Sequence, residues 1–343
     1  MDRNRYPGRF REGEKNMGRI GIYGVGTFGF AFSYMLGRQY KIIAYDRNKN
    51  LIKHLKKYRR HLYHFKNRKA PKNVVFTSDV EDLDKANYII FAVPSFAVRD
   101  VAKNLKDMKG KIIINTAKAL EKDTAKRLSK VITEEMTANV AQFSGGTFAA
   151  DIIRGAPLGA DIACEDVDLL INLQKLFSMP SLRVYGNRDL AGVEYAGAFK
   201  NVIAIFAGIM YGLKLPYGSI THMISRAAKE AEEIAISLGG ERHTFSMESQ
   251  CWGNDLWMSC TGKSRNREFG ILIGKGMDTE KALKIMESQH KMVEGYYTLQ
   301  SLPKLWKKLK SDIFHEIYDI VFNGKDALKS IKDIMEREPE MIK

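Results

Sequence analysis

The chain has 343 residues, of which 45% are hydrophobic and 28% are charged, and it carries a formal net charge of +15. This balance excludes an intrinsically disordered chain, and the length suggests two domains of roughly 150 residues each. No apolar run reaches the ~20 residues of a membrane span, and residues 1–16 lack the apolar core of a secretory signal. The three cysteines are odd in number and have no metal-ligand spacing, so we expect a reducing, cytoplasmic compartment and no metal.

The hydrophobic pattern divides the chain into three parts. Residues 1–17 are expected to form a flexible basic tail. Over residues 18–189 short apolar strands alternate with amphipathic helices, which favours a Rossmann-type, mostly parallel sheet covered by helices. Over residues 190–338 the pattern is helical, and 190–212 is apolar nearly all round, as in a buried core helix. The predicted fold class is therefore α/β, a dinucleotide-binding domain followed by an all-α substrate domain.

The first predicted strand, residues 19–23, runs into a G-x-G-x-x-G sequence that opens an apolar helix. An acidic residue, Asp46, ends the next strand about 20 residues further on, as in dinucleotide-binding folds. The first glycine allows a tight turn, the second admits the pyrophosphate, and the third lets helix and strand pack closely. The residues assigned to the cofactor here are Gly24, Gly26, Thr27, Phe28, Gly29, Asp46 and Arg47.

The choice of dinucleotide depends on two adjacent residues. Asp46 suits the ribose diol of NAD and would repel a 2′-phosphate, whereas Arg47 could pair with that phosphate. The sequence therefore favours NAD as the cofactor and leaves NADP open.

Several further segments resemble one enzyme family. They read "FAVPSFAVRDV" (91–101), "NTAKALEKDT" (115–124), "SGGTFAADI" (144–152), "GVEYAGAFKNVIAIFAGI" (192–209), "CTGKSRNREFG" (260–270) and "MVEGYYT" (292–298). Together they are similar to the NAD(P)-dependent glycerol-3-phosphate dehydrogenases. The resemblance implies interconversion of sn-glycerol 3-phosphate and dihydroxyacetone phosphate, supplying glycerol phosphate for phospholipid synthesis.

The chain departs from the family pattern at three places. Residues 144–147 read Ser-Gly-Gly-Thr where the family usually has Ser-Gly-Pro-Ser, and residues 117–119 read Ala-Lys-Ala instead of Thr-Lys-Gly. The stretch before Asp255 has fewer glycines than expected. These departures concern the fit of the substrate and not the fold.

Three residues are the candidate catalytic groups. Lys200 lies in an apolar helix, where desolvation lowers the pKa of a lysine toward the value a base needs near neutral pH, unless the side chain snorkels to the surface. The resemblance implies that Lys200 exchanges the proton of the C2 hydroxyl. It also implies that Lys118 hydrogen-bonds the substrate oxygen and contacts the cofactor, and that Asp255 binds substrate hydroxyls or orients Lys200.

The remaining site residues come from the family motifs. For substrate binding they are Lys118, Gly145, Thr147, Asp255, Ser264, Arg265 and Asn266. The guanidinium of Arg265 suits bidentate phosphate binding. Additional cofactor contacts implied by the resemblance are Lys118, Ala149, Arg265, Val293 and Glu294.

Two other functions stay open. One is a related two-domain NAD(P)-dependent dehydrogenase of a hydroxy acid or sugar acid. The other is a non-catalytic dinucleotide- or RNA-binding protein, because residues 53–72 are basic with Tyr58, Tyr63 and Phe65 interleaved. We interpret that run as a solvated helix face and loop. The expected partners are a phosphorylated small molecule and a second copy in a homodimer, with no nucleic acid and no membrane span.

Overall fold

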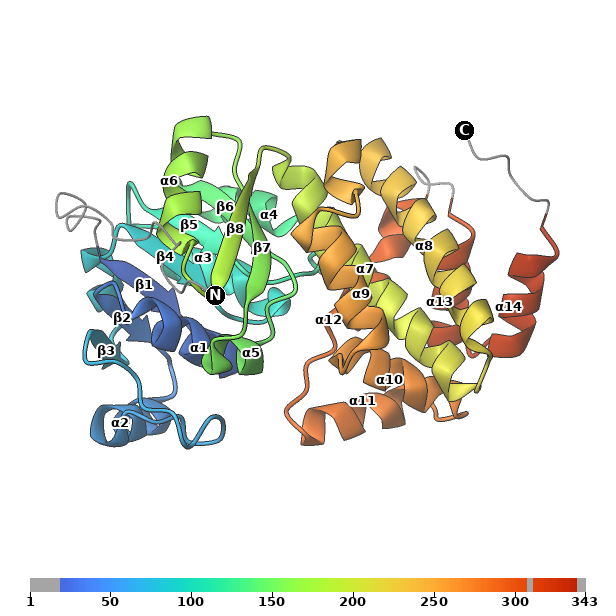
Figure 1. Cartoon of the computed structure of the whole chain (residues 1–343), viewed down its shortest axis with the longest axis horizontal. Coiled ribbons are helices and arrows are strands. Elements are labelled where there is room, and N and C mark those ends of the chain that lie inside the picture. Colours follow the sequence, from blue (N-terminus) through green and yellow to red (C-terminus); the bar gives the residue numbers. More distant parts are fainter. Residues whose placement is uncertain (1–18, 307–310, 338–343) are drawn as a thin grey trace, which may run out of the picture.

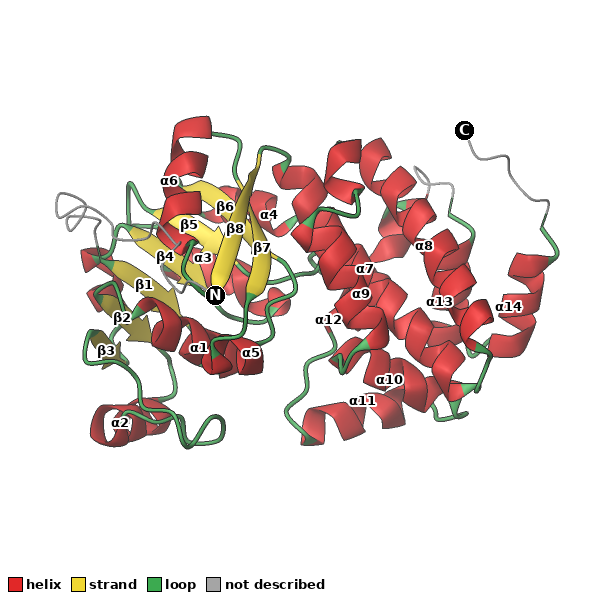
Figure 2. Ribbon diagram, in the orientation of Figure 1, coloured by secondary structure: helices red, strands yellow, loops and turns green. Residues whose placement is uncertain are grey.

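The computed structural model describes residues 19–306 and 311–337. The tail expected over 1–17 lies outside the described residues, as do positions 18 and 338 of the two expected domains. Figures 1 and 2 show a sheet-containing half and an all-helical half side by side. The first half ends with a strand at Asn187, and the second begins with a helix at Leu190.

The sheet has eight strands in the order β3-β2-β1-β4-β5-β6-β7-β8. All neighbouring pairs are parallel except the antiparallel pair of β6 with β7. The predicted Rossmann-type, mostly parallel sheet is confirmed. The strands are β1 (Ile20–Tyr23), β2 (Ile42–Tyr45), β3 (Val74–Thr77), β4 (Tyr88–Phe91), β5 (Ile112–Asn115), β6 (Asn139–Ser144), β7 (Leu158–Ala163) and β8 (Leu182–Asn187).

Helices cover both faces of this sheet. They are α1 (Thr27–Leu36), α2 (Lys49–Tyr58), η2 (Val80–Lys85), η3 (Ser95–Ala97), α3 (Val98–Asn104), α4 (Leu128–Glu135), α5 (Ala149–Arg154) and α6 (Val167–Phe177). One apolar core joins α1, α2, α5 and α6 to the sheet. A second core joins η2, α3 and α4 to its other face. Burial on both faces explains why strands such as β5 are continuous β-branched runs.

The helical half is built around one long helix. Its elements are α7 (Leu190–Gly212), α8 (Tyr217–Ser237), η4 (Arg242–Phe245), η5 (Gln250–Asn254), α9 (Asp255–Thr261), α10 (Arg265–Gly274), α11 (Thr279–Ser288), α12 (Glu294–Ser301), η6 (Leu302–Lys304), α13 (Ile313–Phe322) and α14 (Ala327–Met335). α7 is long and apolar enough to cross a membrane, but its entire apolar window is buried inside the protein. The prediction of a buried core helix is confirmed.

Glycines let α10 pack closely against α7. A Cβ added at Gly208 would lie 2.1 Å from the carbonyl oxygen of Arg267, and one at Gly270 would lie 2.0 Å from that of Ile205. Only glycine leaves room for such contacts, because real Cβ atoms do not approach backbone oxygens so closely. This packing fixes α10, and with it the residues at its start, relative to α7.

Candidate functional site

The candidate site lies at the carboxyl edge of the parallel strands, where open α/β sheets bind ligands. The Gly-rich loop follows β1, Ser95 comes shortly after β4, Lys118 after β5 and Gly145 after β6. Contacts with Lys118 bring α7 and α9 to the same edge. The site is therefore formed between the two halves of the molecule.

In the Gly-rich loop, each glycine has a different structural environment. Gly24 has φ +96°, and a Cβ there would lie 2.7 Å from the carbonyl oxygen of Ala92. A Cβ at Gly29 would lie 1.9 Å from the carbonyl oxygen of Gly24, so this glycine lets α1 pack on the loop. Around Gly26, in contrast, no described atom other than those of Gly26 and its two chain neighbours lies within 4 Å of an added Cβ. Gly24 and Gly29 are therefore needed for close packing in the fold, whereas Gly26 leaves open space.

The start of α1 suits an anionic ligand. Gly26 is its N-cap and supplies no side-chain hydrogen bond, and its first turn holds no acidic residue. Thr27 and Phe28 are the first helical residues, so their backbone N–H groups point out of the positive end of the helix dipole. The open space at Gly26 and these donors fit the pyrophosphate of a dinucleotide.

Asp46 forms hydrogen bonds within this loop. One of its oxygens accepts from the backbone N–H of Val25 at 2.8 Å, and the other accepts from that of Asn48 at 2.9 Å. Arg47 beside it is exposed. The carboxylate thus holds the Gly-rich loop against the end of β2.

A histidine for which the sequence predicts no role also holds this loop. His61 is buried, and its Nε2 lies 3.0 Å from the carbonyl oxygen of Val25. Its Nδ1 accepts from the backbone N–H groups of Tyr63 and His64. Burial lowers the pKa of His61 to about 4, so the ring is neutral at pH 7 and Nε2 donates. No local pattern distinguishes His61 from the neighbouring solvated residues.

The three candidate catalytic residues meet in one cluster. Lys118 Nζ donates to Asp255 Oδ2 at 2.7 Å and to the carbonyl oxygen of Gly145 at 2.6 Å. Lys200 Nζ donates to the other carboxylate oxygen of Asp255 at 3.1 Å. Asp255 and Lys200 are 0% and 5% exposed and Lys118 is partly exposed, so the cluster places two ammonium groups around one buried carboxylate. Lys200 therefore does not snorkel to the surface.

Burial shifts the pKa values of Lys200 and Asp255. Desolvation lowers the pKa of Lys200 to about 8, and the charge of Lys118 acts in the same direction, while the Asp255 carboxylate opposes it. Burial also disfavours the charged form of Asp255, but the two ammonium groups outweigh it and lower the pKa of that carboxyl. Asp255 is thus ionised at neutral pH, and the pKa of Lys200 lies close to neutral pH.

Two residues that sequence reasoning missed complete the cluster. Ser259 Oγ lies 2.9 Å from Lys200 Nζ and one helical turn after Asp255, a spacing that could have revealed it. Asn201 donates to the backbone oxygen of Lys118 at 2.9 Å and accepts from Asn266 at 2.8 Å. Asn266 in turn accepts from the backbone N–H of Gly295, so its amide links α7, α10 and α12.

The loop after β6 lies beside this cluster. Gly145 has φ +155°, and a Cβ there would lie 2.7 Å from the Cα of Ala160. The backbone N–H of Thr147 donates to the carbonyl oxygen of Gly145. The buried hydroxyl of Thr147 donates to the same oxygen, within the same loop. Ala149 is half-buried and begins α5. Gly145 thus joins the loop to Lys118 directly.

The basic segment at the start of α10 contains both buried and exposed residues. Ser264 is buried as the N-cap of α10, where its hydroxyl accepts from Arg267 N and donates to Ser259 O. Arg265 is exposed at the first helical position, with its guanidinium free of ion pairs to the described carboxylates. Ser264 therefore shapes the turn, and Arg265 is available to a ligand.

Glu294 joins the two halves, and Val293 precedes it. Val293 is buried in the core of the helical half. The carboxylate of Glu294 accepts from the hydroxyl and the backbone N–H of Ser95, which follows β4. Burial raises the pKa of Glu294, while these hydrogen bonds and the charge of Arg265 act against the rise. Glu294, the candidate cofactor contact, thus faces the edge of the sheet that carries the Gly-rich loop.

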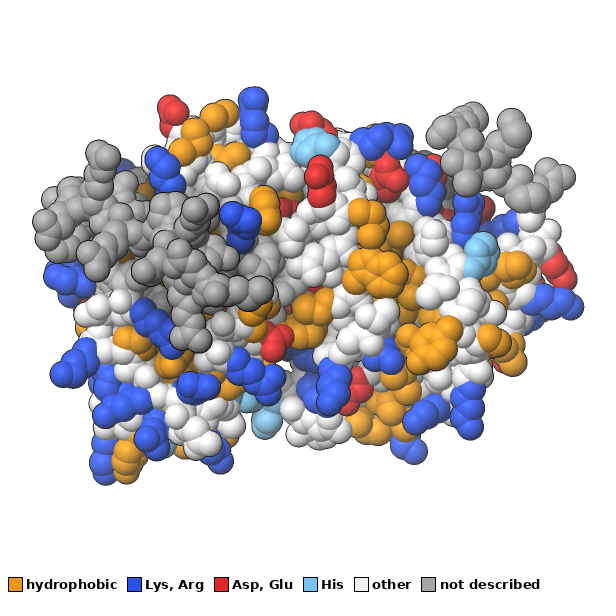
Figure 3. Space-filling model, in the orientation of Figure 1, with side chains coloured by type: hydrophobic (Ala, Val, Ile, Leu, Met, Phe, Trp, Pro, Cys, Tyr) orange, Lys and Arg blue, Asp and Glu red, His pale blue; other side chains and the backbone are white. Residues whose placement is uncertain are grey.

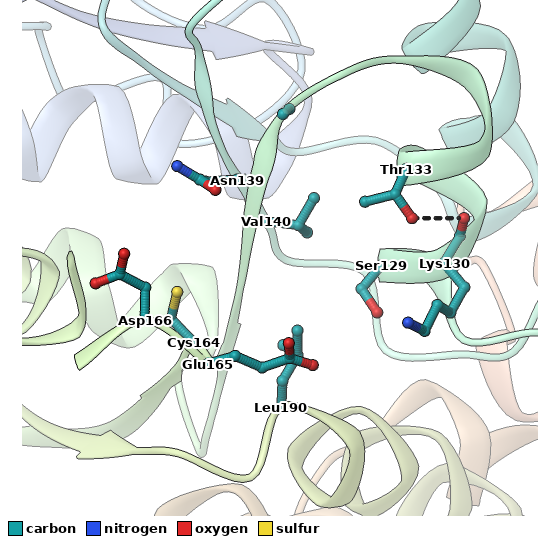
Figure 4. A pocket seen from close by; sticks show the side chains of 10 residues that line it. Ser129, Lys130, Thr133, Asn139, Val140, Cys164, Glu165, Asp166 and Leu190 are labelled. Atoms are coloured by element: carbon teal, nitrogen blue, oxygen red, sulfur yellow. Dashed lines mark hydrogen bonds between the residues drawn. The ribbon is translucent and has the colours of Figure 1, made fainter. Parts of the chain in front are cut away.

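A cavity of about 250 Å³ lies away from this site. Figure 4 shows it lined by Ser129, Cys164 and Leu190 among others, near the start of β6 and the end of β7. These strand ends lie at the opposite edge of the sheet from Lys118. None of the candidate site residues lines this cavity.

Comparison with known proteins identifies the family. Residues 19–170 match the model for the N-terminal part of NAD-dependent glycerol-3-phosphate dehydrogenase, and residues 189–332 match the model for its C-terminal part. The chain belongs to the NAD-dependent glycerol-3-phosphate dehydrogenase family. The resemblance stated from the sequence motifs is confirmed.

Individual relatives agree with this assignment. A glycerol-3-phosphate dehydrogenase, NAD(P)+, of Clostridium tetani is 35% identical over 95% of this chain and 95% of its own. A glycerol-3-phosphate dehydrogenase, NAD(P)+, of Halothermothrix orenii is 34% identical over 94% of this chain and 96% of its own. The crystal structure of a glycerol-3-phosphate dehydrogenase of Coxiella burnetii aligns with a TM-score of 0.85 at 26% identity, covering 93% of this chain and 99% of that one.

Proposed function

We propose that this chain is an NAD(P)-dependent dehydrogenase that interconverts sn-glycerol 3-phosphate and dihydroxyacetone phosphate. The observation that carries the proposal is the buried cluster of Lys118, Asp255 and Lys200 at the edge of the sheet, in a chain whose relatives bear that name. The supply of glycerol phosphate to phospholipid synthesis follows as the physiological role. A cytoplasmic location and a homodimer are part of the same proposal.

Lys200 is the group that moves the proton. In oxidation its neutral form accepts the proton of the C2 hydroxyl, and in reduction the ammonium returns a proton to the C2 oxygen. A lysine whose pKa lies near 8 can do both near neutral pH. Asp255 orients Lys200 and keeps part of its positive charge compensated, because one carboxylate oxygen accepts from each lysine.

Lys118 and Arg265 bind the charged and polar parts of the substrate. Lys118 Nζ is fixed by Gly145 and Asp255 and donates to the substrate oxygen at C2. Exposed Arg265 binds the phosphate, for which its planar guanidinium is suited. Gly145, Thr147, Ser264 and Asn266 support these groups through the turns and links that they form.

The dinucleotide binds at the Gly-rich loop, where Gly26, Thr27 and Phe28 receive the pyrophosphate and Gly24 and Gly29 give the loop its shape. When bound, NAD(P) supplies the nicotinamide that takes the hydride from C2 in oxidation and gives it back in reduction. Ala149, Val293 and Glu294 contact it from the facing segments. We propose NAD as the preferred form because the carboxylate of Asp46 would repel a 2′-phosphate, whereas Arg47 would favour NADP.

The test is the absorbance of the reduced nicotinamide during turnover of dihydroxyacetone phosphate, measured once with NADH and once with NADPH. We expect oxidation of at least one of them, with the higher specificity constant for NADH. Unphosphorylated dihydroxyacetone is the matched control and should react far more slowly. An absence of turnover with both dinucleotides, in a protein that binds them, would contradict the proposed reaction.

A further inference from the structure

A strongly basic segment follows β2 and lies beside the Gly-rich loop. Residues 47–72 contain eleven lysines and arginines and no acidic residue, so this segment holds most of the chain's net charge of +15. Ten of these cations are exposed, namely Arg47, Lys49, Lys53, Lys56, Lys57, Arg60, Lys66, Arg68, Lys69 and Lys72. Figure 3 shows lysine and arginine side chains gathered over the region of α2. We call residues 47–72 the basic surface.

The basic surface rests on an ordered frame. Leu51, Ile52 and Leu55 of α2 are buried in the core under the sheet, which turns the lysines outward. The eleventh cation, Arg59, is half-buried and donates to the backbone oxygens of Ala70 and Val74. The backbone positions that carry the exposed cations are therefore fixed relative to one another.

The exposed cations are not neutralised within the described part of the chain. None of the ten forms an ion pair with a described carboxylate, and the nearby Asp82 is paired with Lys85. Lys49, Lys53 and Lys57 follow one another at a spacing of four residues on α2, where like charges repel. A solvated helix face, as first expected for residues 53–72, ordinarily interleaves carboxylates with its lysines. An external polyanion would relieve this repulsion.

Two exposed aromatic rings lie within the same surface. Tyr58 and Tyr63 are 48% and 64% exposed, and Lys57 Nζ lies 4.9 Å from the centre of the Tyr58 ring. Exposed rings between cations are the combination on which single-stranded nucleic acids bind, because bases stack on the rings while phosphates pair with the cations. A membrane surface fits less well, since the apolar face of α2 is turned inward and has nothing to insert.

We propose that the basic surface binds single-stranded RNA. Phosphates pair with the outward lysines of α2 and the arginines that follow it, and bases stack on Tyr58 and Tyr63. This binding goes beyond the proposed dehydrogenase reaction. It uses residues of α2 and the following loop, away from the cluster of Lys118, Asp255 and Lys200.

The experiment measures fluorescence anisotropy of a labelled 20-nucleotide oligouridylate against the full-length protein over a series of salt concentrations. The test variant is Lys53→Glu/Lys56→Glu/Lys57→Glu. The matched control is Lys214→Glu/Lys275→Glu/Lys329→Glu, which changes the net charge equally at exposed positions of the helical half. We expect the test variant to weaken binding on the order of 100-fold and to reduce the slope of log K against log salt by about 2. The control should bind as the parent does.

A second pair of measurements separates RNA from other anions. Tyr58→Ala/Tyr63→Ala should weaken oligouridylate binding by about tenfold or more at constant charge, because stacking is lost. Turnover of dihydroxyacetone phosphate should be retained in these variants, which shows that they are folded. Equal loss in the test and control variants would overturn the proposal, since net charge alone would then explain binding. Binding of phosphatidylglycerol vesicles without binding of oligouridylate would overturn it in favour of a membrane surface.

Discussion

The Gly-rich loop and the Lys118–Asp255–Lys200 cluster present opposite kinds of chemical group to a ligand. The loop offers backbone N–H groups and open space, because only Gly26 and its chain neighbours lie within 4 Å of a Cβ added at Gly26. The cluster offers three charged side chains, of which Asp255 and Lys200 are buried and Lys118 is partly exposed. The loop comes from one continuous stretch of sequence, whereas the cluster unites residues from three distant segments. Binding and chemistry are therefore separable, and substitutions should affect one without the other.

The largest effect is expected in the cluster. Lys200→Ala removes the proton acceptor, so we expect the turnover number to fall by about 100- to 10,000-fold, while NADH affinity is nearly unchanged. Steady-state kinetics and a fluorescence titration of NADH measure the two effects. Lys200→Arg should not restore turnover, because a guanidinium stays protonated. A Lys200→Ala variant that keeps most of its turnover would transfer the role of base to Lys118.

The next effect is expected in the loop. Gly26→Val should weaken NADH binding by about 100-fold, because the side chain would occupy the space that the pyrophosphate needs, while the melting temperature stays close to that of the parent. Gly24→Val is the contrasting variant: its φ of +96° and the carbonyl of Ala92 at 2.7 Å predict a lower melting temperature. Unchanged NADH affinity in folded Gly26→Val would show that the loop does not hold the dinucleotide.

A smaller effect is expected at the substrate phosphate. Arg265→Ala should raise KM for dihydroxyacetone phosphate by roughly 10- to 100-fold, as expected for a lost charge-assisted hydrogen bond, with little change in KM for NADH. Arg267→Ala is a useful comparison, since Arg267 donates to the backbone oxygens of Thr261 and Gly262. Equal increases in both KM values for Arg265→Ala would remove Arg265 from phosphate binding.

Local sequence signals predicted much of this fold. The alternation of apolar strands and helices gave the parallel sheet, and the apolar composition of residues 190–212 gave the buried helix α7. The family motifs named Lys118, Lys200 and Asp255, which the fold brings into direct contact. The antiparallel pairing of β7 with β6 was not foreseen, because strand direction depends on the path of the connecting segments and not on periodicity.

Other features depend on tertiary contacts that no local pattern reveals. His61 lies in a basic stretch, yet it is buried against the carbonyl oxygen of Val25. Asn201 links Lys118 to Asn266 across the junction of the two halves. The carboxylate of Asp46 binds two backbone N–H groups of its own half. Each of these partners is distant in sequence or a backbone group, so side-chain identity alone does not predict the pairing.

The pH dependence of sn-glycerol 3-phosphate oxidation tests the role of Lys200 most directly. In the proposed reaction neutral Lys200 accepts the proton, and desolvation lowers its pKa to about 8. The value of kcat/KM should therefore rise about tenfold per pH unit below that pKa and level off above it, whereas in the reduction direction it should fall above it. Asp255→Asn should shift this titration to lower pH, because the carboxylate raises the pKa of Lys200. A profile that is flat from pH 6 to 10, or one unchanged in Lys200→Ala, would contradict the account.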